Sequence, residues 1–323
     1  MMAPPLLEME DLNVRLPAGR AARPILAGVS LHVARGETVG LVGESGSGKS
    51  VTCRSVLGLL PEGAEATGSL RVEGDDVLTM SPARLRELRR RGISMVFQDP
   101  RASINPLRRI GDFITEGMRA GGVSREAALR RAGELLESVG IRDPRAALRR
   151  YPHEFSGGML QRVMIAGALA GEPRLLLADE PTTALDVTTQ AEVVSILTGL
   201  RTERAMGMLF VTHDLELAAA ICDRIYVMYA GRIVEAQSAD GLFARPRHPY
   251  TAALLASTPR LDSDLPPRGV PGRPVSLAEA PAGCAFAARC AHARPRCAEH
   301  EPVQREVDGA HVACLRVEEL VDE

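Results

Sequence analysis

A glycine-rich segment, LVGESGSGKSVT, carries the spacing G-x-x-x-x-G-K-S from Gly43 to Ser50. Glycines at these positions allow positive φ angles and turn backbone N–H groups toward the oxygens of a phosphate. Lys49 can then reach the β- and γ-phosphates of a nucleotide, and the Ser50 hydroxyl can bind Mg²⁺. Because a strand-like run precedes the segment and a helical run follows it, the pattern predicts a nucleotide-binding loop. The predicted loop comprises Gly43, Glu44, Ser45, Gly46, Ser47, Gly48, Lys49, Ser50 and Val51.

Two acids follow the apolar run LLLA, which has the composition of a buried parallel strand. Asp179 is placed to bind Mg²⁺ directly or through water, and Glu180 to polarise an attacking water molecule. Alone, an acidic pair at the end of a strand is more often only solvent-exposed. Downstream of a phosphate loop, the pair predicts hydrolysis of a nucleoside triphosphate.

Four of the six cysteines lie in the last forty residues, in a stretch rich in proline and arginine with the spacing C-x5-C-x6-C-x16-C. These four are Cys284, Cys290, Cys297 and Cys314. In a reducing compartment, such a group predicts a metal or cluster site and not disulfides. Four thiolates suit tetrahedral Zn²⁺ or a [4Fe–4S] cluster, and His292, His300 or His311 could replace one of them. Cys53 and Cys222 are expected to pack in the core.

The composition limits the classes of function. The 323 residues are 45% hydrophobic and 25% charged, with a net charge of −2, so no global positive field favours nucleic acid or anionic lipid. Without tryptophan, and with six Phe and four Tyr, a stacking platform for single strands is not expected. No apolar run is long enough to span a bilayer, and the first residues lack a basic signal-peptide region. We therefore expect a cytoplasmic chain with no nucleic acid partner.

Strand-like and helical patterns alternate along the chain. The first forty residues alternate apolar and polar positions, which predicts short strands. Residues 125–140 have helical spacing, with Ser124 as N-cap and Gly140 as the stop. A basic run, RLRELRRRG, is interpreted as a solvated helix face that leads into a strand. The alternation favours an α/β core with a parallel sheet, and proline-rich residues 259–281 predict a linker.

Four further motifs resemble those of ATP-binding cassette (ABC) ATPases and stand in the order typical of that family. The resembling residues are Gln98 in VFQDP (the Q-loop), Phe155–Arg162 in FSGGMLQR (the signature), Asp186 in ALDV (the D-loop) and His213 in VTHD (the switch histidine). The resemblance extends from residue 6 to about residue 245. It implies an α/β P-loop nucleotide-binding domain with a RecA-like core sheet, an antiparallel β subdomain and an α-helical subdomain.

This resemblance implies a domain at residues 1–245, its helical subdomain at about residues 100–165, and a small cysteine-rich extension at residues 246–323. Gln98 would bind Mg²⁺ and, with Glu180 and His213, form the catalytic set. Two such chains would pair head to tail, each signature helix offering its N-terminus to the γ-phosphate bound by the other. The residues expected at that interface are Ser156, Gly157, Gly158, Met159 and Asp186.

One position departs from the family pattern. ABC ATPases usually carry an aromatic near the first strand that stacks on adenine, whereas NVRLPAGR offers Leu16 and no aromatic occurs before Phe97. An arginine plane is an alternative platform. We expect relaxed base selectivity, with ATP and GTP supporting similar hydrolysis.

The segment PRHPYTAALLASTPRLD closely resembles the His-Pro-Tyr segment of oligopeptide, dipeptide and nickel importer ATPases, and QDPRASINPLRRIGD resembles the peptide-importer version of the Q-loop region. The resemblance, to the D-subunit type of importer ATPase, implies that ATP and Mg²⁺ power peptide import. Expected partners are a second ABC ATPase in a heterodimer, two transmembrane permeases and an extracytoplasmic substrate-binding protein. The chain would then lie on the cytoplasmic face of the inner membrane, held by the permeases.

The same resemblance favours a [4Fe–4S] cluster over Zn²⁺ at the four cysteines, because similar importer ATPases carry clusters and no C-x2-C zinc pair is present. A structural role for the cluster is the simplest hypothesis. Alternatives remain for function: import of nickel or another small solute, a soluble ABC ATPase outside transport, or a redox sensor that gates ATPase activity. A soluble ABC ATPase usually has two cassettes or a long insertion, and this chain has neither.

Overall fold

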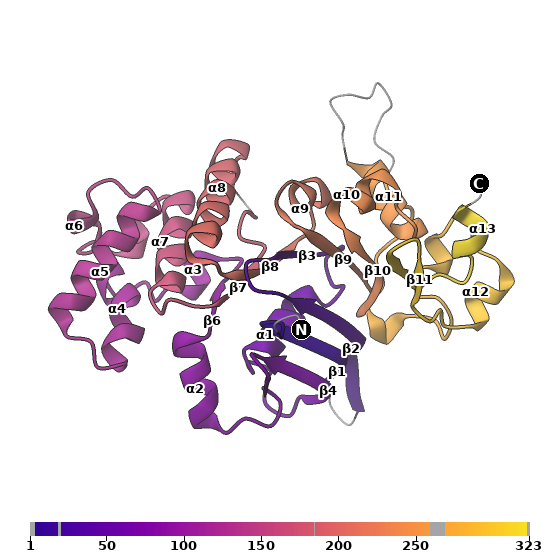
Figure 1. Cartoon of the computed structure of the whole chain (residues 1–323), viewed down its shortest axis with the longest axis horizontal. Helices are drawn as coiled ribbons and strands as arrows, with labels where there is room; N and C mark the ends of the chain where they lie inside the picture. Colours follow the sequence, from indigo (N-terminus) through magenta and orange to yellow (C-terminus); the bar gives the residue numbers. More distant parts are fainter. Residues whose placement is uncertain (1–3, 19–20, 184, 259–268, 322–323) are drawn as a thin grey trace. The chain divides into compact units, whose positions relative to one another are not determined.

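The computed structural model describes residues 4–18, 21–183, 185–258 and 269–321. The chain divides into two compact units, the first formed by residues 1–33, 38–79 and 210–323 and the second by residues 34–37 and 80–209 (Figure 1). The predicted linker at residues 259–281 lies outside the described residues as far as residue 268. Among the helices that are described, none combines the length and apolarity needed to cross a bilayer.

The first unit contains an antiparallel sheet with the strand order β2-β1-β4-β5. Its strands are β1 (Leu7–Ala18), β2 (Ala21–Val33), β4 (Glu65–Val72) and β5 (Asp75–Asp76). The expectation of short strands was wrong for β1 and β2, which have 12 and 13 residues. Leu7 and Met9 are buried, and so are Leu12 and Val14. A register shift between Met9 and Leu12 moves the apolar face by one residue, so a single long strand keeps both pairs in the core.

The same unit holds a second sheet in which the strands follow the order β11-β12-β10-β9-β3-β8. These strands are β3 (Thr38–Val42), β8 (Gly207–Thr212, whose last three residues belong to this unit), β9 (Arg224–Tyr229), β10 (Arg232–Ser238), β11 (Arg305–Val307) and β12 (Ala310–Val312). β3 and β9 are parallel, but β9, β10, β12 and β11 pair antiparallel. The sheet is therefore mixed and not parallel as predicted. The reason is local: Ala230 (φ 44°) and Gly231 (φ 74°) form a two-residue turn between β9 and β10.

Short helices complete the first unit. They are α1 (Lys49–Val56), α9 (Leu215–Ile221), α10 (Ala239–Ala244), α11 (Pro249–Ser257), α12 (Pro295–Glu299) and α13 (Val317–Val321), with 3₁₀ turns η2 (Leu277–Glu279) and η3 (Ala287–Arg289). Cys53 and Cys222 are buried, as predicted. Residues 284–321 add to this unit the β11–β12 hairpin and the three short helical segments η3, α12 and α13.

The second unit combines two parallel strands with a group of helices. Its elements are α2 (Pro82–Arg91), β6 (Ile93–Val96), α3 (Pro100–Ser103), α4 (Ile110–Ala120), α5 (Arg125–Ser138), α6 (Pro144–Ala147), η1 (Pro152–Glu154), α7 (Gly157–Leu169), β7 (Leu175–Asp179), α8 (Val187–Arg204) and the start of β8. The Ser124 hydroxyl accepts the Ala127 N–H at 3.3 Å, which confirms the predicted N-cap of α5. Within this group, α4, α5 and α7 pack against one another (Figure 1).

Candidate nucleotide site

The predicted phosphate loop lies between β3, which is fully buried, and the first turn of α1. Two of its glycines are required by packing. A Cβ on Gly43 would lie 2.1 Å from the Met228 carbonyl oxygen, and one on Gly48 would lie 2.7 Å from Leu26 Cδ2. Gly48 has a φ of 110°, and Gly46 a φ of 81°, angles that other residues rarely adopt. The backbone therefore has the conformation that the sequence pattern predicts.

Lys49 turns back over this loop. Its side chain is buried, and Nζ donates hydrogen bonds to the carbonyl oxygens of Gly43 (2.7 Å) and Glu44 (3.1 Å). An ammonium group held against two carbonyls is already positioned beside the concave loop, where an anionic phosphate would bind. Ser50, the second residue of α1, is half-buried.

His213 belongs to the same unit and follows β8 directly. Its side chain is exposed. The next residue, Asp214, caps α9 by accepting the Leu217 N–H at 3.0 Å. The cap fixes the point at which the chain leaves the sheet, and with it the position of the histidine.

The second unit brings Gln98 and Glu180 together. β6 pairs in parallel with β7, and Val96 lies opposite Ala178, so the residues that follow both strands emerge at the same edge of the sheet. Gln98 Nε2 donates to Glu180 Oε2 at 3.0 Å, and Thr183 Oγ1 donates to the same oxygen at 2.9 Å. Asp179, the last residue of β7, is buried.

The signature and D-loop residues also lie side by side in this unit. Ser156 caps α7 by accepting the Met159 N–H at 3.3 Å, and Asp186 caps α8 by accepting the Thr189 N–H at 3.0 Å. The Thr189 hydroxyl also donates to Asp186, at 2.7 Å, and the two hydrogen bonds hold the pKa of that carboxyl below its usual value. A Cβ on Gly158 would lie 2.5 Å from Thr189 Cγ2. The first turns of α7 and α8 therefore touch, which requires a glycine at position 158.

The His-Pro-Tyr segment fastens the extension to the core of the first unit. The N–H of His248 donates to Glu235 on β10 at 2.9 Å, and His248 Nδ1 accepts the Tyr250 N–H at 3.0 Å as the N-cap of α11. Burial lowers the pKa of His248 to about 4, so the ring is neutral at physiological pH. The Tyr250 hydroxyl accepts the Glu44 N–H at 2.9 Å. The motif thus contacts both β10 and the phosphate loop through hydrogen bonds.

The four predicted cysteines converge on one pocket of the extension, together with His248 and His292. Burial raises the pKa of Cys284 to about 11 and also raises the pKa values of Cys290 and Cys314. The thiols of Cys284, Cys290 and Cys314 are therefore protonated at neutral pH unless a metal displaces their protons. Across the described residues, no group of three or more His, Cys, Asp or Glu side chains is arranged to hold a metal ion.

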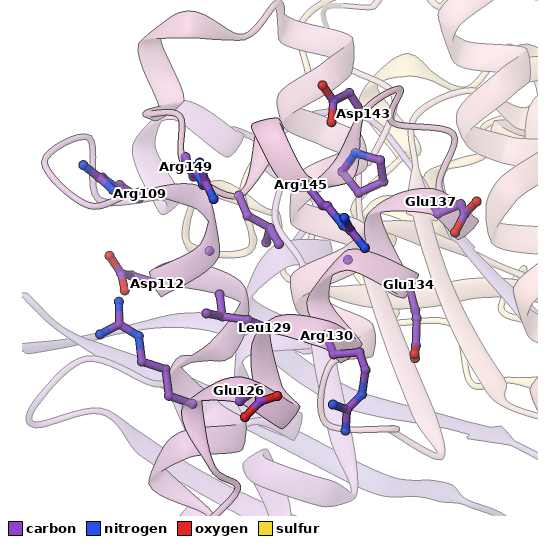
Figure 2. A pocket seen from close by; sticks show the side chains of 15 residues that line it. Arg109, Asp112, Glu126, Leu129, Arg130, Glu134, Glu137, Asp143, Arg145 and Arg149 are labelled. Carbon is purple, nitrogen blue, oxygen red and sulfur yellow. The ribbon is translucent and has the colours of Figure 1, made fainter.

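A larger pocket, of about 1010 Å³, opens among α4, α5 and α6 in the second unit (Figure 2). Figure 2 shows that both arginines and acids surround it, among them Arg109, Asp112, Arg130 and Glu134. None of the site residues predicted from the sequence lines this pocket. The site residues predicted from the sequence therefore lie on loops at strand ends and at helix N-termini, and not in the lining of this pocket.

Comparison with known proteins defines the class. Residues 26–183 match the family model "ABC transporter", and residues 234–297 match "Oligopeptide/dipeptide transporter, C-terminal region". One similar solved structure is the dimeric ATP-binding cassette MJ0796, bound to ADP and Pi in a post-hydrolysis state. It is 28% identical to this chain, with a TM-score of 0.65, and the match covers 72% of this chain and 98% of that one. The fold is that of an ABC ATPase subunit.

Two relatives match almost the whole chain. The probable peptide ABC transporter ATP-binding protein y4tR of Sinorhizobium fredii is 46% identical, over 98% of this chain and 96% of its own length. The oligopeptide transport ATP-binding protein OppD of Bacillus subtilis is 44% identical, over 95% of this chain and 87% of its own length. The chain therefore belongs to the ABC transporter family, as an ATP-binding subunit of an oligopeptide importer. The fold, family and ATPase activity predicted from the sequence are confirmed.

Proposed function

We propose that both units of this importer subunit contribute residues to its ATPase cycle. In the first, the backbone of residues 43–48, Lys49 and Ser50 bind the phosphates of ATP, and His213 contacts the γ-phosphate. In the second, Glu180 polarises the attacking water, while Asp179 and Gln98 take part in holding Mg²⁺. Mg²⁺, where bound, neutralises developing charge on the phosphates. The observation that carries these roles is the hydrogen bond from Gln98 to Glu180.

The signature residues act on a partner's nucleotide under this proposal. Ser156 and the following glycines stand at the N-terminus of α7, a helix of 13 residues with Ser156 exposed at its start, where unpaired N–H groups favour an anion. MJ0796 was solved as a dimer, which supports pairing of cassettes. We propose that the partner is a second, different ATPase, that two permeases hold the pair at the cytoplasmic face of the inner membrane, and that an extracytoplasmic binding protein delivers cargo.

The domain organisation is proposed as follows. Residues 1–245 form the nucleotide-binding domain, with its helical subdomain at about residues 100–165. Residues 246–323 form the importer-type extension, and the family match to residues 234–297 supports a boundary near this position.

The assembled transporter provides the test of function. ATP turnover is measured with the neighbouring permeases, the partner ATPase and a binding protein loaded with di- to pentapeptides. Strong stimulation by the peptide-loaded binding protein is expected, together with none by a nickel-loaded one. Stimulation by nickel alone would move the cargo to metal uptake, and stimulation by neither would contradict import of both.

We further propose that the four cysteines hold a [4Fe–4S] cluster with a structural role. Their donor set and their convergence on one pocket support this proposal, and the cluster would bind residues 284–314 into one unit although their apolar area is small. The ligands would be Cys284, Cys290, Cys297 and Cys314.

Anaerobic purification tests the cluster. About four irons and four acid-labile sulfides per chain are expected, given the cluster type, and Cys290→Ser should lose them while Cys222→Ala, a change of a buried cysteine outside the pocket, keeps them. One zinc and no iron would establish the zinc alternative. Absence of both metals would contradict a metal or cluster site at the four cysteines.

A further inference from the structure

A buried arginine of the extension forms a bidentate salt bridge with the side chain of a phosphate-loop residue. Arg289 is the last residue of η3, immediately before Cys290, and its side chain is 5% exposed. Its two terminal nitrogens donate to the two carboxylate oxygens of Glu44, at 2.6 Å and 2.9 Å. A bidentate pair between guanidinium and carboxylate is among the strongest and most directional side-chain contacts. Residues 245 positions apart in the chain are therefore held in one geometry.

The arginine is itself fixed by its surroundings. Its Nε donates to the Pro271 carbonyl at 2.6 Å, and one terminal nitrogen donates to the Tyr229 hydroxyl at 3.3 Å. The guanidinium carbon lies 5.7 Å from the centre of the Tyr229 ring and 5.8 Å from that of Phe286. With its rotamer fixed on several sides, the arginine can hold Glu44 in only one place.

Hydrogen bonds constrain the side chain, the N–H and the carbonyl of Glu44, and Arg289 binds the side chain. Its N–H donates to the Tyr250 hydroxyl at 2.9 Å, and its carbonyl accepts from Lys49 Nζ at 3.1 Å and from the Ser47 N–H at 3.3 Å. The orientation of this peptide thus determines where Lys49 is anchored. Loss of the Arg289 contact to the Glu44 side chain is expected to alter the loop, because the backbone of the same residue bonds to Tyr250 and Lys49.

We infer that Arg289 is a positioning residue for the phosphate loop: through Glu44 it holds the loop in its phosphate-binding conformation, so the carboxy-terminal extension sets the nucleotide affinity of the chain. The inference rests on the nucleotide-binding role that is proposed above for the loop. The inference is independent of what the four cysteines hold.

Removal of the Arg289 guanidinium tests whether this contact affects nucleotide affinity. Arg289→Met keeps a long side chain of similar reach but leaves the partly buried Glu44 carboxylate without its partner, an unfavourable state. The full chain is titrated with ADP and with a non-hydrolysable ATP analogue. We expect Kd for both to rise ~10-fold, the scale of one strong charge-assisted contact. Arg289→Lys, which restores the charge without the fork, should recover part of the affinity.

Arg316 provides the matched control. Its side chain is similarly buried, 6% exposed against 5% for Arg289, and it borders the cysteine pocket. It donates to the His292 carbonyl at 2.7 Å and pairs with Glu319, both within the extension. Arg316→Met therefore disturbs the extension without removing the contact to Glu44. We expect its Kd values to stay within about twofold of the parent chain, well below the change of a lost contact.

A double-mutant cycle separates direct from indirect action. If Arg289 acts through Glu44, Glu44→Gln and Arg289→Met combined should bind nucleotide no more weakly than the weaker single variant. Hydrogen exchange at residues 43–50 of the nucleotide-free chain should accelerate in Arg289→Met and not in Arg316→Met. Should Arg289→Met fail to fold, Arg289→Lys serves in the same cycle. Unchanged affinity, equal losses in both arginine variants, or additive losses in the cycle would each overturn the inference.

Discussion

Glu180 adopts an unusual backbone conformation for its residue type, with a φ of 47°. A non-glycine residue in the left-handed region is disfavoured, and such residues cluster at functional positions. Its carboxylate accepts hydrogen bonds from Gln98 and Thr183 on one oxygen. These two hydrogen bonds orient the carboxylate that is proposed to polarise the attacking water.

Replacing Glu180 with Gln should lower ATP turnover by at least ~100-fold, the usual contribution of a general base. The amide keeps the size of the side chain but cannot take a proton. Because the phosphate loop is unchanged, nucleotide binding should persist and an ATP-bound dimer should accumulate, as size-exclusion chromatography with ATP would show. Glu172→Gln is the control, since Glu172 is an exposed acid with a similar φ of 51°. Unchanged turnover in Glu180→Gln would remove Glu180 from the catalytic set.

His248 makes the stability of the first unit dependent on pH. Burial lowers its pKa from 6.5 to about 4, so between these values the unfolded chain binds a proton that the folded chain does not. Stability is thus complete above pH 6.5 and falls by roughly 3 kcal/mol as the pH approaches 4. Glu235, whose pKa is raised by burial, acts in the opposite direction.

His248→Asn isolates the contribution of the histidine. Asparagine is a preferred N-cap and can accept the same N–H without titrating. Urea unfolding at pH 7.5 and pH 5 should show a smaller loss of stability in this variant than in the parent chain. An identical loss in both would assign the pH dependence to other groups.

At the scale of elements, local signals were sufficient for much of the chain. The phosphate loop was predictable because its glycines are required by their own φ angles and close contacts, and α5 because a serine cap and a buried stripe lie within its own sequence. The β11–β12 hairpin and the pairing of Arg289 with Glu44 were not predicted. The hairpin does carry a local signal, the Asp308-Gly309 turn between its strands with φ angles of 49° and 79°. The pairing of β12 with β10 and that of Arg289 with Glu44 join segments far apart in the chain, and no pattern within these segments indicates the partner.

Two helix glycines of the second unit should respond oppositely to alanine. A Cβ on Gly133, within α5, meets no atom within 4 Å, so Gly133→Ala should stabilise the protein by about 0.5–1 kcal/mol. A Cβ on Gly167, within α7, would lie 2.6 Å from Phe113 Cε1, so Gly167→Ala should destabilise it by about 1–3 kcal/mol. Denaturant midpoints measure both. Equal effects would show that helix propensity, and not the contact with Phe113, decides.

At the scale of the whole molecule, the two units carry groups of different kinds. The first holds the phosphate loop and the His-Pro-Tyr segment, while the second holds the acids, the Q-loop glutamine and the signature. Lys49 is already anchored within its own unit by two carbonyls. The exposed N-cap of α7, Ser156, accepts a hydrogen bond from the N–H of Met159 in its own helix. The proposed dimer accounts for the place of the signature, because it assigns the signature to the nucleotide of the partner.

Variants of Ser156 and Lys49 should therefore separate binding from turnover. Lys49→Ala should abolish nucleotide binding by the isolated chain, because the loop loses its cation. Ser156→Arg should leave that binding intact and lower turnover of the assembled transporter at least ~10-fold, since a bulky side chain blocks the donors at the helix N-terminus.

Ser124→Arg controls for the lost cap. Ser124 is also an exposed N-cap serine, with the same 3.3 Å hydrogen bond to its helix, so either change to arginine should cost about 1 kcal/mol of stability. Only the change at Ser156 should affect turnover, because only that helix is proposed to face a partner's phosphate. Weaker nucleotide binding by isolated Ser156→Arg would place the signature at the chain's own nucleotide and contradict the composite site. Equal turnover in both serine variants would contradict any role for the signature helix in hydrolysis.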